Sequence, residues 1–134
     1  MSQEHYPVLW IGQVAVVMLP DEIDVTNADT VREELLSVMN QGATLLVADM
    51  SKTNFCDSAG VSALVRTFRR ASGNASAMRM VVSTPAVQRV LSITGVDRMI
   101  DVFPSVAASL AGQVQPDQIQ PDNAAAAADA DGGA

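Results

Sequence analysis

The chain has little cysteine, histidine or aromatic character, and it has no long apolar run. A single cysteine, Cys56, cannot form an internal disulfide, and a single histidine, His5, leaves no ligand set for a zinc site. No apolar run reaches the ~18 residues of a membrane-spanning helix, and the N-terminal segment 1–5 lacks the basic start of a secretory signal. We therefore expect a cytoplasmic protein that holds no metal and does not insert into a membrane.

Acidic residues outnumber basic ones, but the excess is concentrated in one segment. The net charge is −7, and residues 112–134 hold four aspartates and no lysine or arginine. The rest of the chain has 11 acidic and 8 basic side chains, which gives a net charge of only −3. Such a mildly acidic body favours neither nucleic acid nor an anionic membrane surface as a partner.

The composition also changes at Gly112, after which Gln, Pro, Asp and Ala dominate. Val114 and Ile119 are the only large apolar residues of this segment, which cannot bury enough surface to offset the entropy lost on ordering. With 49% hydrophobic residues overall, the sequence predicts one domain over residues 1–111 and a disordered tail over residues 112–134.

Within the domain, β-rich runs alternate with helical patterns in the order β-β-α-β-α-β-α-β-α. Strands separated by helices require parallel pairing with right-handed crossovers, and a hairpin through Gly12 and Gln13 opens the chain, so the sheet should be mixed. Thr26, Thr84 and Ser105 are the expected N-caps of three of the helices. The expected fold class is α/β, with about five strands (8–11, 14–19, 43–50, 78–82, 100–103) and about four helices (28–39, 61–71, 85–95, 105–110).

The segment Phe55-Cys56-Asp57-Ser58-Ala59-Gly60 lies between an apolar run typical of a central strand and a helical pattern. Asp57 and Ser58 are both of the type that caps a helix. The first N–H groups of a helix lack internal partners and carry partial positive charge, so a phosphate on Ser58 would be tolerated there. From spacing alone, a plain helix cap and a modified serine are equally consistent with the sequence.

The residues around Ser58 argue against an enzyme. A hydrolase nucleophile elbow requires G-x-S-x-G, but Cys56 occupies the first glycine position, and His5 precedes the first strand. The sequence also contains no Gly-rich loop of the form GxxxxGK[ST], which would hold a nucleotide phosphate. We therefore expect neither catalysis nor a bound cofactor.

Two other groups of residues are candidates for contact with a partner. Asp21 and Asp24 belong to an acidic loop, and because no second ligand cluster accompanies it, a partner-facing loop is favoured over a metal site. Ser62 and Arg66 follow Ser58 at i+4 and i+8, which places all three on one stripe of a helix. We expect Ser62 and Arg66 to contact the partner, with an ordinary solvated face as the alternative.

Two motifs, the acidic segment 21–24 and the segment 57–60, resemble signatures of a known family and follow each other in the same order as in that family. The segment Asp57-Ser58-Ala59-Gly60, preceded by 47–51 and 53–55, resembles the phosphorylation loop of bacterial anti-sigma-factor antagonists, which are STAS-domain proteins. The acidic segment 21–24 with the helical run 28–39 is similar to the second signature, although Pro20-Asp21 stands where many members carry Gly-Glu. The resemblance covers roughly residues 8–111 and implies a STAS fold. It further implies phosphorylation of Ser58 and partner contacts by Asp21, Asp24, Thr53 and Asp57.

The resemblance also implies a function in partner switching. The unphosphorylated protein would bind an anti-sigma factor that is also a serine kinase, and this docking would release the sigma factor. A phosphate on Ser58 adds a charge of about −1.5 to −2 beside Asp57, so binding would stop until a serine phosphatase removes it. The alternative is a STAS scaffold subunit of a stress-signalling or lipid-transport assembly, in which Ser58 is never phosphorylated.

Removal of residues 112–134 is expected to leave the stability of the domain nearly unchanged, because this segment contributes little burial. Thermal unfolding of the full chain and of a variant truncated at Gly112 measures the difference. A fall in melting temperature of more than a few degrees would show that the segment packs on the domain.

Overall fold

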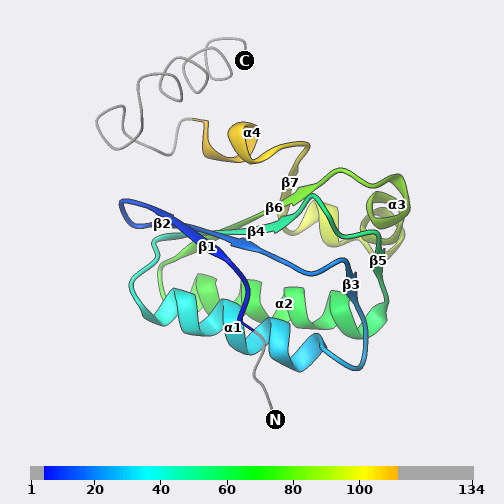
Figure 1. Cartoon of the computed structure of the whole chain (residues 1–134), viewed down its shortest axis with the longest axis horizontal. Helices are drawn as coiled ribbons and strands as arrows, with labels where there is room; N and C mark the ends of the chain where they lie inside the picture. The colour runs from blue at the N-terminus through cyan, green and yellow to red at the C-terminus, as the bar shows by residue number, and fades with distance from the viewer. Residues whose placement is uncertain (1–4, 112–134) are drawn as a thin grey trace.

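The computed structural model describes residues 5–111, and the predicted tail lies outside the described residues. Five strands form one sheet in the spatial order β1-β2-β4-β6-β7 (Figure 1). Their bounds are β1 Val8–Ile11, β2 Val14–Met18, β4 Leu45–Met50, β6 Ala77–Val82 and β7 Asp101–Phe103. The predicted α/β fold with a mixed sheet is confirmed, because β1 and β2 pair antiparallel and the other neighbours pair in parallel.

The central strand, β4, is buried along its whole length. It pairs with β2 on one side and with β6 on the other, so that Val47 lies between Val16 and Arg79. A nearly continuous apolar run is stable only in a strand that is covered on both faces, which explains this position. In the β1–β2 hairpin, Gly12 has a φ of 60°, as the expected turn requires.

Helices cover both faces of the sheet. Because each parallel strand is added on the same side of the previous one, right-handed crossovers place three helices on one face. In Figure 1, α1 and α2 lie side by side along this face, and α4 lies over the opposite one. The helices are α1 Ala28–Asn40, α2 Ser58–Gly73, α3 Pro85–Thr94 and α4 Val106–Leu110, with a 3-10 turn, η1, at Val96–Arg98.

Alternate residues of the strands point into two apolar clusters. The larger cluster packs the sheet against α1, α2 and α3, and it includes Leu35, Leu64 and Leu91 from these helices. The smaller cluster lies on the face beneath α4 and consists of Val14, Val16, Leu45, Val47 and Val81, with Val106 and Leu110 packed against it. The two-residue period of the strands therefore builds a core on both sides of the sheet.

The helix starts agree with the expected caps at α3 and α4 but not at α1. Thr84 is the residue before α3, and the side chain of Ser105 accepts a backbone N–H at the start of α4. The prediction for Thr26 is wrong, because Asn27 is the N-cap residue of α1 and the Thr26 hydroxyl donates to Asp24. Short polar side chains readily form such bonds within their own turn, and here that local bond replaces the cap.

Two short strands that the sequence did not predict form a second sheet. β3 (Glu22–Ile23) and β5 (Phe55–Cys56) pair in parallel, with Ile23 opposite Cys56. Strands of two residues are too short to show the alternation by which a strand is recognised. Their pairing joins the acidic loop to the segment before α2, and so determines where α2 begins.

Gly60 allows α2 to pack tightly against this strand pair. A Cβ atom at this position would lie 2.7 Å from the Sγ atom of Cys56 and 2.8 Å from the Cγ2 atom of Ile23. It would also lie 3.1 Å from the backbone oxygen of Ile23. Since non-bonded carbon atoms prefer separations of about 3.5–4.0 Å, any side chain here would push the helix away from the strands.

Gly60→Ala is therefore expected to lower the free energy of unfolding by about 1–3 kcal/mol, the usual cost of an extra methyl group in a packed site. Gly73→Ala is the matched control, because Gly73 ends the same helix and nothing lies within 4 Å of a Cβ atom there. The control should be neutral or slightly stabilising, since alanine favours a helix over glycine. Urea unfolding of both variants measures the difference, and equal stabilities would contradict the close packing at Gly60.

Candidate functional site

Ser58 is the first residue of α2, and its side chain is exposed. Asp57 is the N-cap, since its carboxylate accepts a hydrogen bond of 3.0 Å from the backbone N–H of Gly60. With the cap provided by Asp57, the Ser58 hydroxyl has no hydrogen-bond partner among residues 5–111. It is therefore an exposed hydroxyl beside the N–H groups and the positive dipole end of a helix.

Residues 51–57, which we call the Ser58 loop, and residues 20–25, the acidic loop, are held together by backbone hydrogen bonds. The N–H of Asn54 donates to the carbonyl of Asp21 at 2.8 Å, and the N–H of Asp57 donates to the carbonyl of Ile23 at 3.1 Å. These bonds flank the β3–β5 pairing. The two motifs that were recognised separately in the sequence therefore lie side by side at the N-terminal end of α2.

Thr53, which was expected to contact a partner, is fully buried. Its hydroxyl donates to the carbonyl of Pro20 at 2.7 Å, and its own carbonyl accepts the hydroxyl of Thr84 at 2.8 Å. A direct contact with a partner requires an exposed side chain, which Thr53 does not have in this structure. Through these two hydrogen bonds Thr53 links the loop before β3 to the start of α3, and so holds the Ser58 loop in position.

The two aspartates of the acidic loop have different surroundings. Asp21 is exposed, whereas the carboxylate of Asp24 accepts the hydroxyl and the N–H of Thr26. The bond from the hydroxyl, followed by the bond from the N–H, holds the pKa of Asp24 below its ordinary value. The side chain of Asn27 closes the same turn by accepting the N–H of Asp24 at 2.9 Å. The Asp24 carboxylate therefore stays ionised and shapes the loop.

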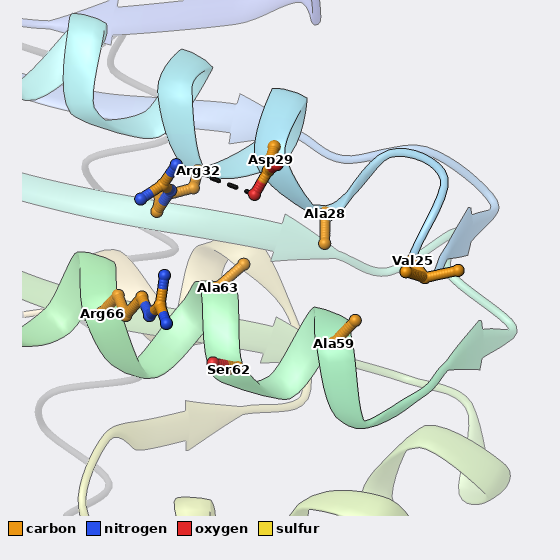
Figure 2. Close-up of a pocket in the computed structure, with 8 residues that line it drawn as sticks. All are labelled: Val25, Ala28, Asp29, Arg32, Ala59, Ser62, Ala63 and Arg66. Atoms are coloured by element: carbon orange, nitrogen blue, oxygen red, sulfur yellow. Dashed lines mark ion pairs between the residues drawn. The ribbon is translucent and has the colours of Figure 1, made fainter.

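Ser62 and Arg66 line a pocket of about 180 Å³ between α1 and α2, which we call the α1–α2 groove (Figure 2). Ser58 begins the same helix but is not among the lining residues. The groove thus brings Ser62 and Arg66 together with α1, which the sequence analysis did not connect with them. The lining residues are Val25, Ala28, Asp29, Arg32, Ala59, Ser62, Ala63 and Arg66.

Sequence reasoning missed three further surface residues, namely Val25, Phe55 and Arg32. Val25 is 77% exposed and Phe55 is 48% exposed, and they belong to the acidic loop and the Ser58 loop respectively. Large apolar side chains that remain exposed in neighbouring loops are typical of recognition surfaces. The sequence does hint at this exposure, because Val25 and Phe55 lie outside the regular apolar spacing of any helix or strand and so are not required to be buried. Arg32 carried no such signal, because its role depends on the packing of α1 against α2.

The described residues provide Ser58 with no histidine, because His5 lies against α1, where its Nδ1 atom is 3.2 Å from the Oε2 atom of Glu34. Residues 5–111 contain no group of three or more His, Cys, Asp or Glu side chains that could hold a metal ion. In the same part of the chain, no helix has both the length and the apolar character needed to cross a membrane.

Cys56 is a free thiol that is buried beneath the Ser58 loop. Burial, followed by the negative charge of Asp57, raises the pKa of this thiol from 9.0 to about 11. Since the thiolate is the reactive form of cysteine, Cys56 is chemically inert near neutral pH. Its role is to pack against Ile23 and Gly60.

A mixed five-stranded sheet with crossover helices on one face, and with paired loops before α2, is the fold of a STAS domain. Residues 7–109 match the family model of the STAS domain, so the chain belongs to this family. Within the family, the resemblance to anti-sigma-factor antagonists is confirmed by the relatives described next.

The anti-sigma-B factor antagonist of Bacillus subtilis is 29% identical over 86 residues, which cover 64% of this chain and 78% of that protein. An anti-sigma factor antagonist from Mycobacterium paratuberculosis is 26% identical, with a TM-score of 0.72 over 78% of this chain and 89% of that one. The anti-sigma factor antagonist SpoIIAA, in its unphosphorylated form, is 20% identical, with a TM-score of 0.65 over 78% and 93% of the two chains. This last likeness shows the shared fold.

The raised pKa of Cys56 predicts a pH dependence of stability. Between pH 9.0 and about 11 the unfolded chain loses the thiol proton while the folded chain keeps it, so stability should fall as the pH rises through this window. The loss should reach at most about 2.7 kcal/mol, and it should be absent in Cys56→Ala. Urea unfolding of both proteins at about pH 8 and about pH 10 tests this. The same pH slope in the two proteins would contradict the raised pKa.

Proposed function

We propose that this protein is an anti-sigma factor antagonist that acts by partner switching. In its unmodified form it binds an anti-sigma factor that is also a serine kinase, and the sigma factor is released. Phosphorylation of Ser58 by that kinase ends the binding, and a serine phosphatase restores it. The protein acts in the cytoplasm through the domain of residues 1–111. Membership of the STAS family and the antagonists among its relatives support this function.

The observation that carries the proposal is the exposed hydroxyl of Ser58 at the start of α2. A kinase must reach this oxygen and the chain on both sides of it, and an exposed helix start permits such access. Asp57 already caps the helix through Gly60, so a change at the Ser58 oxygen does not remove the cap. A phosphate there is also stabilised by the helix N–H groups and dipole, so the folded domain tolerates it.

The phosphate acts on the interface more than on the fold. It adds a charge of about −1.5 to −2 beside the carboxylate of Asp57. A docked partner would have to remove water from both charges, which is costly unless each gains an opposite charge. Because the helix dipole offsets part of this charge inside the domain, the modification should change partner affinity far more than the free energy of unfolding.

The contact surface around Ser58 combines charged and apolar side chains. Asp21 and Asp57 supply the negative charge, and the exposed side chains of Val25 and Phe55 supply apolar area. Aromatic residues near the centre of an interface usually carry a large share of the binding energy. Thr53 contributes indirectly, because it holds the loop in place from beneath.

Incubation with the cognate kinase and ATP is expected to add one phosphate, and to add it at Ser58. Ser58→Ala should abolish the modification but retain kinase binding and the parental unfolding midpoint, because the lost hydroxyl is not the helix cap. Ser58→Asp should bind at least about tenfold more weakly, because a carboxylate carries part of the charge of a phosphate. Mass spectrometry locates the phosphate, and isothermal titration calorimetry measures the affinities.

Ser72→Ala is the matched control, because Ser72 is exposed near the far end of the same helix and does not line the α1–α2 groove. This variant should still be phosphorylated at Ser58. A phosphate found on Ser51, Thr53 or Ser62 would contradict the switch, and so would a Ser58→Asp variant that binds as tightly as the parent. A protein that binds no such kinase would point instead to a scaffold subunit of a stress-signalling or lipid-transport assembly.

A further inference from the structure

The α1–α2 groove concentrates positive charge on an acidic protein. Arg32 of α1 and Arg66 of α2 stand on opposite walls with their guanidinium groups at the same end of the groove, and Val25 lies at the other end (Figure 2). Alanines of both helices line the space between them. With a net charge of −7 over the whole chain, two guanidinium groups that share one pocket depart from the general charge of the molecule.

These two arginines are poorly neutralised by the residues around them. The one carboxylate that lines the groove, Asp29, is 90% exposed, and its Oδ1 atom lies 3.7 Å from the Nη2 atom of Arg32. An exposed pair of this kind contributes little to stability. The Nε atom of Arg32 is buried without a hydrogen-bond partner in the described part of the chain, and Arg66 forms no ion pair within residues 5–111. Both the buried donor without a partner and the facing like charges are energetically unfavourable.

We propose that the α1–α2 groove binds a carboxylate side chain, glutamate or aspartate, of the protein that docks on the Ser58 surface. The inference rests on the proposed function, because it assigns the groove to that same partner. One carboxylate can accept an Nη–H of Arg32 and a guanidinium N–H of Arg66 together, which places a negative charge between two positive ones. The hydroxyl of Ser62 is a further donor on the same wall.

The size of the groove favours a single side chain over a larger ligand. Its volume of about 180 Å³ is below the ~300–1,000 Å³ that is typical of pockets for small-molecule ligands. The small alanine side chains leave room for the carboxylate between the helices.

The position of the groove places it in the same interface as Ser58. Ser58 and Arg66 are eight residues apart on α2, which corresponds to about 12 Å along the helix axis. A protein interface of standard size covers about 800 Å² on each partner, which is wide enough to include both. A partner that docks here would therefore contact a negative region at Asp57 and, about 12 Å further along the same helix, the positive groove.

The test uses the full chain and its cognate kinase, with Arg32→Gln and Arg66→Gln as groove variants. Arg89→Gln is the matched control, because Arg89 is exposed on α3 and does not line the groove. Each groove variant should bind the kinase about tenfold more weakly or worse, and the control should bind like the parent. Since the lost contact is between opposite charges, the affinity of the groove variants should also fall less steeply with added salt.

Thermal unfolding distinguishes a binding role from a structural one. The melting temperature of Arg66→Gln should equal or exceed that of the parent, because one of two facing like charges has been removed. Parental affinity in Arg66→Gln, or weakened affinity with the parental salt dependence, would overturn the inference. If Ser58→Asp loses binding while both groove variants keep it, the groove has no such role and the proposed function stands. If the parent binds no kinase, the proposed function fails, and the inference fails with it.

Discussion

The start of α2 depends on the backbone pairing of β3 with β5. This pairing brings the carbonyl of Ile23 to the N–H of Asp57, and Asp57 in turn caps the helix through Gly60. The helix can approach the strands this closely only because Gly60 has no side chain. Ser58 therefore owes its exposure at the helix start to contacts made by its neighbours Asp57 and Gly60.

Under the proposed binding of a carboxylate in the groove, the distribution of charge accounts for how an acidic protein would recognise an acidic group on another protein. Asp21, Asp24 and Asp57 gather near the start of α2, and the groove arginines lie further along the same surface. Because hydrogen bonds hold the pKa of Asp24 below its ordinary value, the carboxylate of Asp24 stays ionised even in mildly acidic solution. Under the same proposal, a partner would have to present an opposite charge to each of these two regions, which would disfavour simple polyanions and polycations.

The sequence was sufficient to predict the strands and helices whose apolar residues recur at a regular spacing. It was not sufficient where contacts between residues far apart in the chain determine the structure. The continuous apolar run of β4 predicted a central strand, and the helical spacing of apolar residues predicted α1 over 28–39, close to its observed bounds. β3 and β5 are too short to have a period, and several capping-type residues in a row hid the true cap, Asn27. Thr53 is polar but buried, because the carbonyl of Pro20, far away in sequence, accepts its hydroxyl. The groove depends on how two helices pack, which no single segment encodes.

One consequence follows from the fact that α2 runs without interruption from Ser58 to Gly73. Ser58 and the α2 wall of the groove belong to one continuous helix, so their relative positions are fixed. Substitutions on α1 can alter the groove while leaving the serine and its cap untouched. Under the proposed function, substitutions on α1 would change which partner binds, whereas phosphorylation at the start of α2 would change whether it binds, so related proteins in one cell could share the same phosphorylation chemistry without crosstalk.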